Sequence, residues 1–151
     1  MKLIHRLACT LVLAAAATGA LAGASKAEAT AQVNAAVAHV KKVGVEQAVK
    51  DFNTDPQWKV NGMNVIANDA KGMVLASSLN DKLRGKSTIE IKDPSGKFFI
   101  KEATDLAATK GEGWVEYQFV NPETKKIEDR TMFVKQTPGG VGFIAVAISK
   151  Q

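Results

Sequence analysis

The chain has 151 residues, and its 20 lysine and arginine residues against 15 acidic ones give a net charge of +5 at pH 7. The basic residues are spread along the sequence, which is typical of a solvated surface and argues against nucleic-acid binding. The one cysteine, Cys9, lies near the N-terminus. A chain of this length can bury one hydrophobic core, so we expect a single domain.

The N-terminal segment has the pattern of a secretory signal peptide. Lys2 and Arg6 precede an apolar stretch at residues 7–21, which is short for a membrane-spanning helix. The A-x-A sequence at residues 27–29 predicts cleavage before Thr30, with residues 22–24 as a weaker alternative. We therefore predict a cleaved signal peptide at 1–29, one mature domain at 30–151, and export to the periplasm; a retained membrane anchor is the alternative. Without Cys9, the mature chain would have no disulfide, thiolate nucleophile or zinc–cysteine site.

Residues 30–52 have the periodicity of a long helix. Small or apolar residues recur in steps of three and four and form one stripe, namely Val33, Val37, Val40, Gly44, Ala48 and Phe52. Pro56 ends this pattern, because the residue before a proline is disfavoured in the helical conformation. We expect this helix either to pack across a sheet or to pair with a second copy of the chain.

The next part of the sequence predicts short elements joined by turns. Apolar runs at 63–66 and 73–77 flank turn residues at 68–72, which is the pattern of a β-hairpin. Residues 79–86 predict an irregular or one-turn helical connector, and residues 88–91 predict a brief strand. Residues 93–96, with the sequence Asp-Pro-Ser-Gly, give a strong turn signal.

The C-terminal part predicts a short helix followed by a three-stranded meander. The helix covers residues 98–109 and ends at Gly111, and the strands cover 114–120, 127–135 and 141–149. The last strand is apolar on both faces, as expected for a central strand. Together these elements predict an α+β fold, an antiparallel sheet with helices on its faces.

Six short segments, in this order along the chain, resemble the single Cache domain, a PAS-like family of bacterial extracytoplasmic sensor domains. They are residues 69–72, 83–86 (LRGK), 93–97 (DPSGK), 111–117 (GEGWVEY), 121–122 (NP) and 133–135 (FVK). The resemblance implies a long N-terminal helix packed on a five- to six-stranded antiparallel sheet, with a short second helix and a small-molecule pocket. It also implies sensing of a small organic ligand, such as a carboxylate or an amino acid, and signalling to a membrane receptor or kinase.

This sequence departs from the family pattern at three places that bear on the pocket. The strand at 63–66 lacks the usual aromatic residue, Ser77-Ser78 stands where His-Pro is common, and the last strand ends Ala-Ile-Ser at 147–149. The resemblance therefore implies the fold more directly than it implies the ligand.

Candidate ligand-binding residues follow from strand position and side-chain chemistry. Arg130 is the preferred cation for an anionic ligand, because it lies within a strand, although a solvated strand face is the alternative. Strand alternation places Met132 on the face of Arg130, and it places Trp114 and Tyr117 on opposite faces. Arg84 is a second cation candidate. The full predicted set is Arg130, Tyr117, Trp114, Met132, Trp58 and Ser77.

The sequence gives no catalytic constellation. His39 is the one histidine after residue 29 and lies near the apolar stripe, where a packed or interface role is favoured. We expect no enzyme activity, cofactor or metal. The leading hypothesis is an exported, soluble ligand-binding domain that reports to a separate membrane sensor. The alternative is a structural subunit with a filled core and no cavity beside Arg130, which dimerises or docks through its long helix.

Overall fold

The computed structural model describes residues 23–121 and 124–150. The helices in these residues are α1 (Lys26–Val43), α2 (Val45–Thr54) and α3 (Phe99–Lys110). The strands are β1 (Lys59–Val60), β2 (Met63–Asp69), β3 (Val74–Ser77), β4 (Glu112–Val120), β5 (Ile127–Gln136) and β6 (Gly142–Ser149). Most of the predicted signal peptide lies outside the described residues, so its cleavage stays a prediction.

The strands form one antiparallel sheet, which confirms the predicted fold class. Their order is β1-β2-β6-β5-β4, and β3 also pairs with β2. Strand β6 is central, as predicted, because it pairs with β2 on one side and β5 on the other. It starts at Gly142, where an added Cβ would lie 2.6 Å from the Cα of Asp69. Only glycine allows β2 and β6 to approach this closely.

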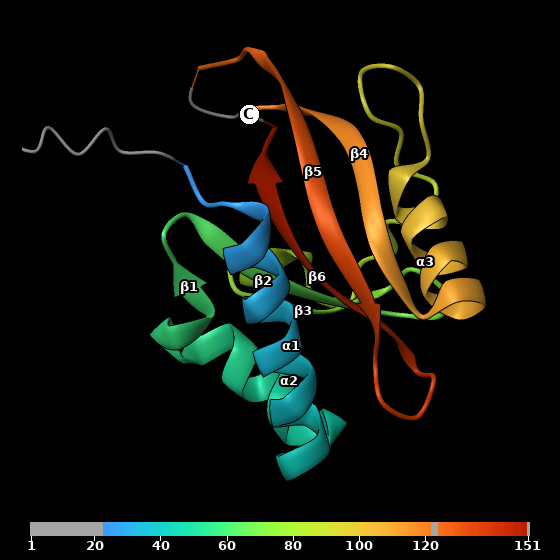
Figure 1. The fold of residues 1–151 in the computed structure, drawn as a ribbon. Coiled ribbons are helices and arrows are strands. Elements are labelled where there is room, and N and C mark those ends of the chain that lie inside the picture. The colour runs from blue at the N-terminus through green and yellow to red at the C-terminus, as the bar shows by residue number, and fades with distance from the viewer. Residues whose placement is uncertain (1–22, 122–123, 151) are drawn as a thin grey trace, which may run out of the picture.

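Helices cover both faces of the sheet (Figure 1). Helices α1 and α2 pack on one face, against alternate residues of β2 and β6 such as Val65 and Val146. Helix α3 packs on the other face, where Ile100, Ala103 and Ala107 contact the intervening residues of β5 and β6. Because successive side chains of a strand point to opposite faces, the apolar side chains of the sheet form two separate hydrophobic clusters, one on each face.

The prediction of one helix over residues 30–52 was wrong at both its start and its middle. Helix α1 begins earlier, at Lys26, where Ser25 and Glu28 form a capping box. The chain then breaks at Gly44, whose φ of 83° is outside the helical region, and α2 continues in a new direction. Ala48 and Phe52 are still buried after the break, so the apolar periodicity continues across it and does not reveal it.

Two further differences concern short strands. Residues 88–91 form a turn instead of the predicted strand, because Ile91 N–H bonds back to Thr88 O within the segment and so does not pair with a neighbouring strand. The two-residue β1 strand was not predicted. The predicted hairpin, the one-turn connector, helix α3 and the three closing strands are all confirmed, with ends shifted by up to three residues.

Candidate functional site

A cavity of about 410 Å³ lies on the α3 side of the sheet. Its floor is formed by side chains of β2, β3, β5 and β6, and β4 closes one side. The segment from Leu79 to the start of α3 covers it. The volume falls in the range typical of small-molecule sites, about 300–1,000 Å³. Apolar side chains form most of the wall, namely Ile66, Val74, Leu79, Leu83, Ile91, Phe99, Ile100, Phe119, Val120 and Ala147.

Arg130 supplies the cavity with a positive charge. It projects from β5 beside Tyr117, its register partner in β4, and its Cζ lies 5.1 Å from the centre of the Phe119 ring. The Nε–H group of Arg130 is buried and has no hydrogen-bond partner among the described residues. A buried donor on a charged group is costly to leave unmatched, so this position is suited to an anionic acceptor.

Tyr117 forms part of the cavity wall next to Arg130. Its ring stacks on Phe99 of α3, with centres 4.6 Å apart and planes 7° apart. Burial raises the pKa of the Tyr117 hydroxyl, and the nearby Arg130, through its charge and a hydrogen bond, partly offsets this. The hydroxyl is therefore protonated at neutral pH, and the stack ties α3 to β4.

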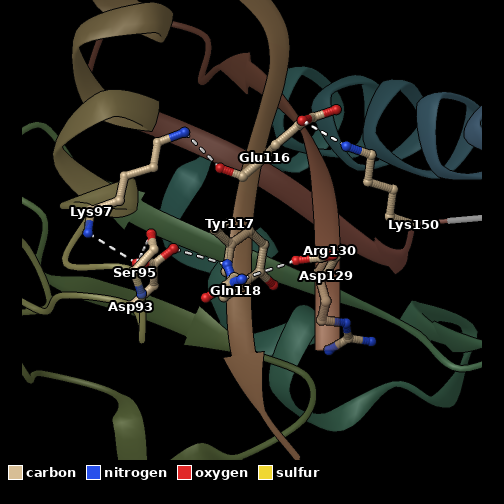
Figure 2. Close-up of a pocket in the computed structure, with 9 residues that line it drawn as sticks. All are labelled: Asp93, Ser95, Lys97, Glu116, Tyr117, Gln118, Asp129, Arg130 and Lys150. Carbon is tan, nitrogen blue, oxygen red and sulfur yellow. Dashed lines mark hydrogen bonds and ion pairs between the residues drawn. The ribbon is translucent and has the colours of Figure 1, made fainter. Parts of the chain in front are cut away.

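Asp93 anchors the cover of the cavity to the sheet. Its Oδ1 accepts hydrogen bonds from Ser95 N (2.9 Å), Ser95 Oγ (2.6 Å) and Lys97 N (2.9 Å), and its Oδ2 accepts one from Gln118 N in β4 (2.9 Å; Figure 2). Burial alone would raise the pKa of Asp93, but these hydrogen bonds lower it to about 2. The carboxylate is thus ionised and fully engaged at neutral pH.

A second polar anchor lies at the inner end of the cavity. Asn68, which is 1% exposed, donates from Nδ2 to Thr88 Oγ1 (3.0 Å) and to Gly72 O (3.3 Å). Thr88 Oγ1 in turn donates to Gly72 O at 2.8 Å. These contacts hold the β2–β3 hairpin and the cover together, while Asn68 Oδ1 has no partner among the described residues.

A shallower pocket of about 210 Å³ lies beside Asp93 at the surface (Figure 2). Its two lysines are already paired, because Lys97 Nζ lies 2.8 Å from Glu102 and Lys150 Nζ lies 3.0 Å from Glu116. Exposed ion pairs of this kind contribute little stability and leave neither lysine available for a ligand. Arg130 lines both this pocket and the larger cavity. The larger cavity is the better candidate site.

The structure brings three of the predicted site residues together. Arg130, Tyr117 and Ser77 line the cavity. Met132 is on the face of Arg130, as the alternation predicted, but it is buried under α3 and does not line the cavity. Arg84 is exposed and lies 3.5 Å from Asp81, so it is not placed as a ligand cation.

The two tryptophans lie on the opposite side of the sheet from the cavity. Trp114 packs on Phe133, with ring centres 5.2 Å apart, and Lys26 lies over its indole. Trp58 packs edge-to-face on Phe52, with ring centres 4.9 Å apart, so it is a core residue and does not line the cavity. His39, for which a packed or interface role was predicted, has its ring centre 5.3 Å from that of Trp58 and bonds to Asp51.

Several residues of the site were not identified from the sequence. Asn68, Asp93 and Phe119 line the cavity, together with the cover residues around Ile91. The Asp-Pro-Ser-Gly turn did carry a signal, since an Asp that starts such a turn bonds to the backbone that follows it. What the turn could not reveal is that the same carboxylate also reaches β4.

The fold defines a class of protein, a PAS-like α+β domain, and this one has a cavity beside its central sheet. A family model, Single Cache domain 2, matches residues 7–140. The chain therefore belongs to the single Cache domain family, whose members are sensory and typically non-enzymatic ligand-binding modules. A search of curated proteins gives no match.

Solved structures of sensor domains share this fold. A methyl-accepting chemotaxis protein from Vibrio parahaemolyticus has a TM-score of 0.65 at 19% identity, covering 82% of this chain and 87% of its own. The periplasmic sensor domain of a chemotaxis protein has a TM-score of 0.63 at 16% identity, covering 81% and 88%. A Cache chemosensory domain described for carboxylic acid recognition has a TM-score of 0.61 at 22% identity, covering 79% and 80%. At these identities the similarity establishes the fold.

Among the described residues, no helix has the length and apolar character needed to cross a membrane. Their histidine and acidic side chains also form no group of three that could hold a metal ion.

Proposed function

We propose that this protein is an exported sensory domain that binds a small carboxylate in the 410 Å³ cavity, with Arg130 as the cation. The observation that carries the proposal is the buried Nε–H of Arg130, which has no partner among the described residues and lines a mostly apolar cavity. A carboxylate oxygen would accept from this group in a site of low dielectric, where a charge-assisted hydrogen bond is strong. The similar Cache domain described for carboxylic acid recognition supports the same ligand class.

The proposed role is binding that is reported to a membrane protein, and not catalysis. The similar domains belong to chemotaxis proteins, one of them described as periplasmic, which supports a periplasmic location and a receptor or kinase partner. The apolar stretch at residues 7–21 supports export. In this proposal the ligand shifts the domain between two states that a separate membrane sensor distinguishes.

Calorimetry with organic acids tests the proposal. Binding of at least one carboxylate is expected, and Arg130→Gln should weaken it roughly 10- to 100-fold, because a charge-assisted hydrogen bond contributes about 1.5–3 kcal/mol. Arg84→Gln is the matched control, since Arg84 is exposed and pairs only with Asp81. The proposal would be contradicted if no acid in a broad panel of carboxylates bound, or if the two substitutions had equal effects on binding.

The alternative role, a structural subunit without a ligand, has less support. It predicted a filled core beside Arg130, whereas Arg130 lines a cavity. It also relied on the apolar stripe of the N-terminal helix for dimerisation, but Val33, Val37 and Val40 are buried against the chain's own sheet. Light scattering at several concentrations tests dimerisation directly.

A further inference from the structure

We propose that the ligand is a monocarboxylate with an extended apolar body, and not a dicarboxylate, an amino acid or a two-carbon acid. This inference rests on the proposed function, because it takes Arg130 as the carboxylate site. It adds what the remaining wall of the cavity can and cannot accommodate.

The charged residues of the wall determine which ligand charges can be matched. These residues are Lys92, Asp93 and Arg130. The Asp93 carboxylate already accepts four hydrogen bonds from the protein, so it cannot receive the ammonium group of an amino acid. The Lys92 side chain is exposed, and its ammonium lies over the Phe98 ring at 4.8 Å. A second carboxylate would therefore be desolvated without a buried cation, and an ammonium would meet one neutral acceptor, Asn68 Oδ1, and no charged one, which is costly.

The size and composition of the cavity favour a long apolar body. A two-carbon acid would fill only a small part of the 410 Å³ and leave the rest to water. That water would lie against Ile66, Val74, Ile100 and Ala147, which offer it no hydrogen bonds. An alkyl or aryl body would displace it and bury apolar surface.

The strand register gives the direction of this body. Arg130 pairs with Ser149 and Asn68 pairs with Phe143, so the two ends of the floor are six residues apart along β6, roughly 20 Å. Ala147 lies between them. Val120, which is 48% exposed, lies beyond Arg130 on the side away from Asn68, and it marks the open end together with Leu79. The carboxylate would thus sit near the mouth, and the body would run inward past Ala147 toward Asn68.

A chain-length series tests this inference on the purified protein. Calorimetry with acetate, butyrate, hexanoate and octanoate should show Kd falling by up to about fourfold per added methylene, the equivalent of about 0.8 kcal/mol per buried CH₂. Suberate and 2-aminooctanoate, which add one charge to an eight-carbon acid, should bind at least about tenfold more weakly than octanoate.

A variant locates the body of the ligand. Ala147→Leu fills the middle of the cavity and should remove most of the advantage of octanoate over butyrate. Ala108→Leu, at an exposed position of α3, is the control and should leave the series unchanged. If acetate, suberate or 2-aminooctanoate binds as tightly as octanoate, the inference is overturned while the proposed function stands. If no carboxylate binds, the proposed function itself fails. The wild-type series decides between these results even if Ala147→Leu does not fold.

Discussion

Asp93→Asn is the substitution that best tests how the cover is held over the cavity. The wild-type carboxylate is 7% exposed and accepts three hydrogen bonds within its own turn and one from Gln118 N in β4. An asparagine has nearly the same shape but only one acceptor atom, and its NH₂ group would face a backbone donor. Either the turn or the contact with β4 must then be lost, so the variant should be destabilised.

The pKa of Asp93 gives the size of this effect. It is lowered from 3.8 to about 2, and each pH unit corresponds to about 1.36 kcal/mol, so the carboxylate contributes at most about 2.5 kcal/mol. The loss of one hydrogen bond to a charged acceptor, such as that from Gln118 N, costs about 1.5–3 kcal/mol, which is a similar figure. For a domain of this size, such a loss lowers Tm by roughly 8–12 °C.

The contribution of Asp93 to the free energy of unfolding depends on pH in a definite direction. Because the pKa is lower in the folded state than in the unfolded state, the stabilisation is fully present above about pH 4 and is lost as the pH falls toward 2. The difference in unfolding free energy between wild type and Asp93→Asn should therefore be largest at pH 7 and shrink at pH 3. Asparagine does not titrate, so the variant lacks this part of the acid sensitivity.

Urea unfolding at pH 7 and pH 3, followed by circular dichroism, measures both quantities. Asp129→Asn is the matched control, because Asp129 is exposed and its side chain makes one long hydrogen bond, 3.3 Å to Gln118 Nε2. If Asp93→Asn were as stable as the control at pH 7, or equally destabilised at both pH values, the anchoring argument would be refuted.

Three further predictions concern the sheet, the first helix and the site. Gly142→Ala should lower the free energy of unfolding by more than about 3 kcal/mol or prevent folding, because the added Cβ would overlap the β2 backbone. Gly139→Ala is the control, since its Cβ would meet open space, and it should lower the free energy of unfolding by about 1–2 kcal/mol in thermal unfolding. In a chain that retains residues 23–29, Ser25→Ala should cost about 1 kcal/mol in urea unfolding by removing the cap of α1, and no loss would show that α1 does not depend on it. Tyr117→Phe should keep the stack on Phe99 and the Tm within a few degrees but weaken carboxylate binding severalfold, and unchanged affinity in calorimetry would exclude a role for the hydroxyl.

Local periodicity was enough to predict the elements that matter most to the sheet. The alternation of apolar and polar residues correctly placed Arg130 and Met132 on one face and separated Trp114 from Tyr117. The apolar character of residues 141–149 correctly made β6 central. These are short-range properties of a strand, so they can be read without knowing its neighbours.

What could not be predicted depends on contacts between distant segments. The break at Gly44 leaves the apolar stripe intact, so no change of pattern marks it. The cavity lies under a cover that Asp93, Asn68 and Thr88 fasten to the sheet, and these contacts span 16 to 25 residues. Met132 lies on the same face of β5 as Arg130. Its exclusion from the cavity depends on the position of α3, which covers the Met132 side chain.

The way in which the cover is fastened bears on how this site could change during evolution. The polar side chains of Asp93, Thr88 and Asn68 do the fastening, and they bond to backbone groups or to one another. The apolar side chains that shape the cavity, such as Ile66 and Ala147, make none of these bonds. Substitutions among the apolar set can therefore reshape the cavity without removing any of the bonds that fasten the cover. The residues that would set specificity are in this way separate from the residues that hold the cover in place.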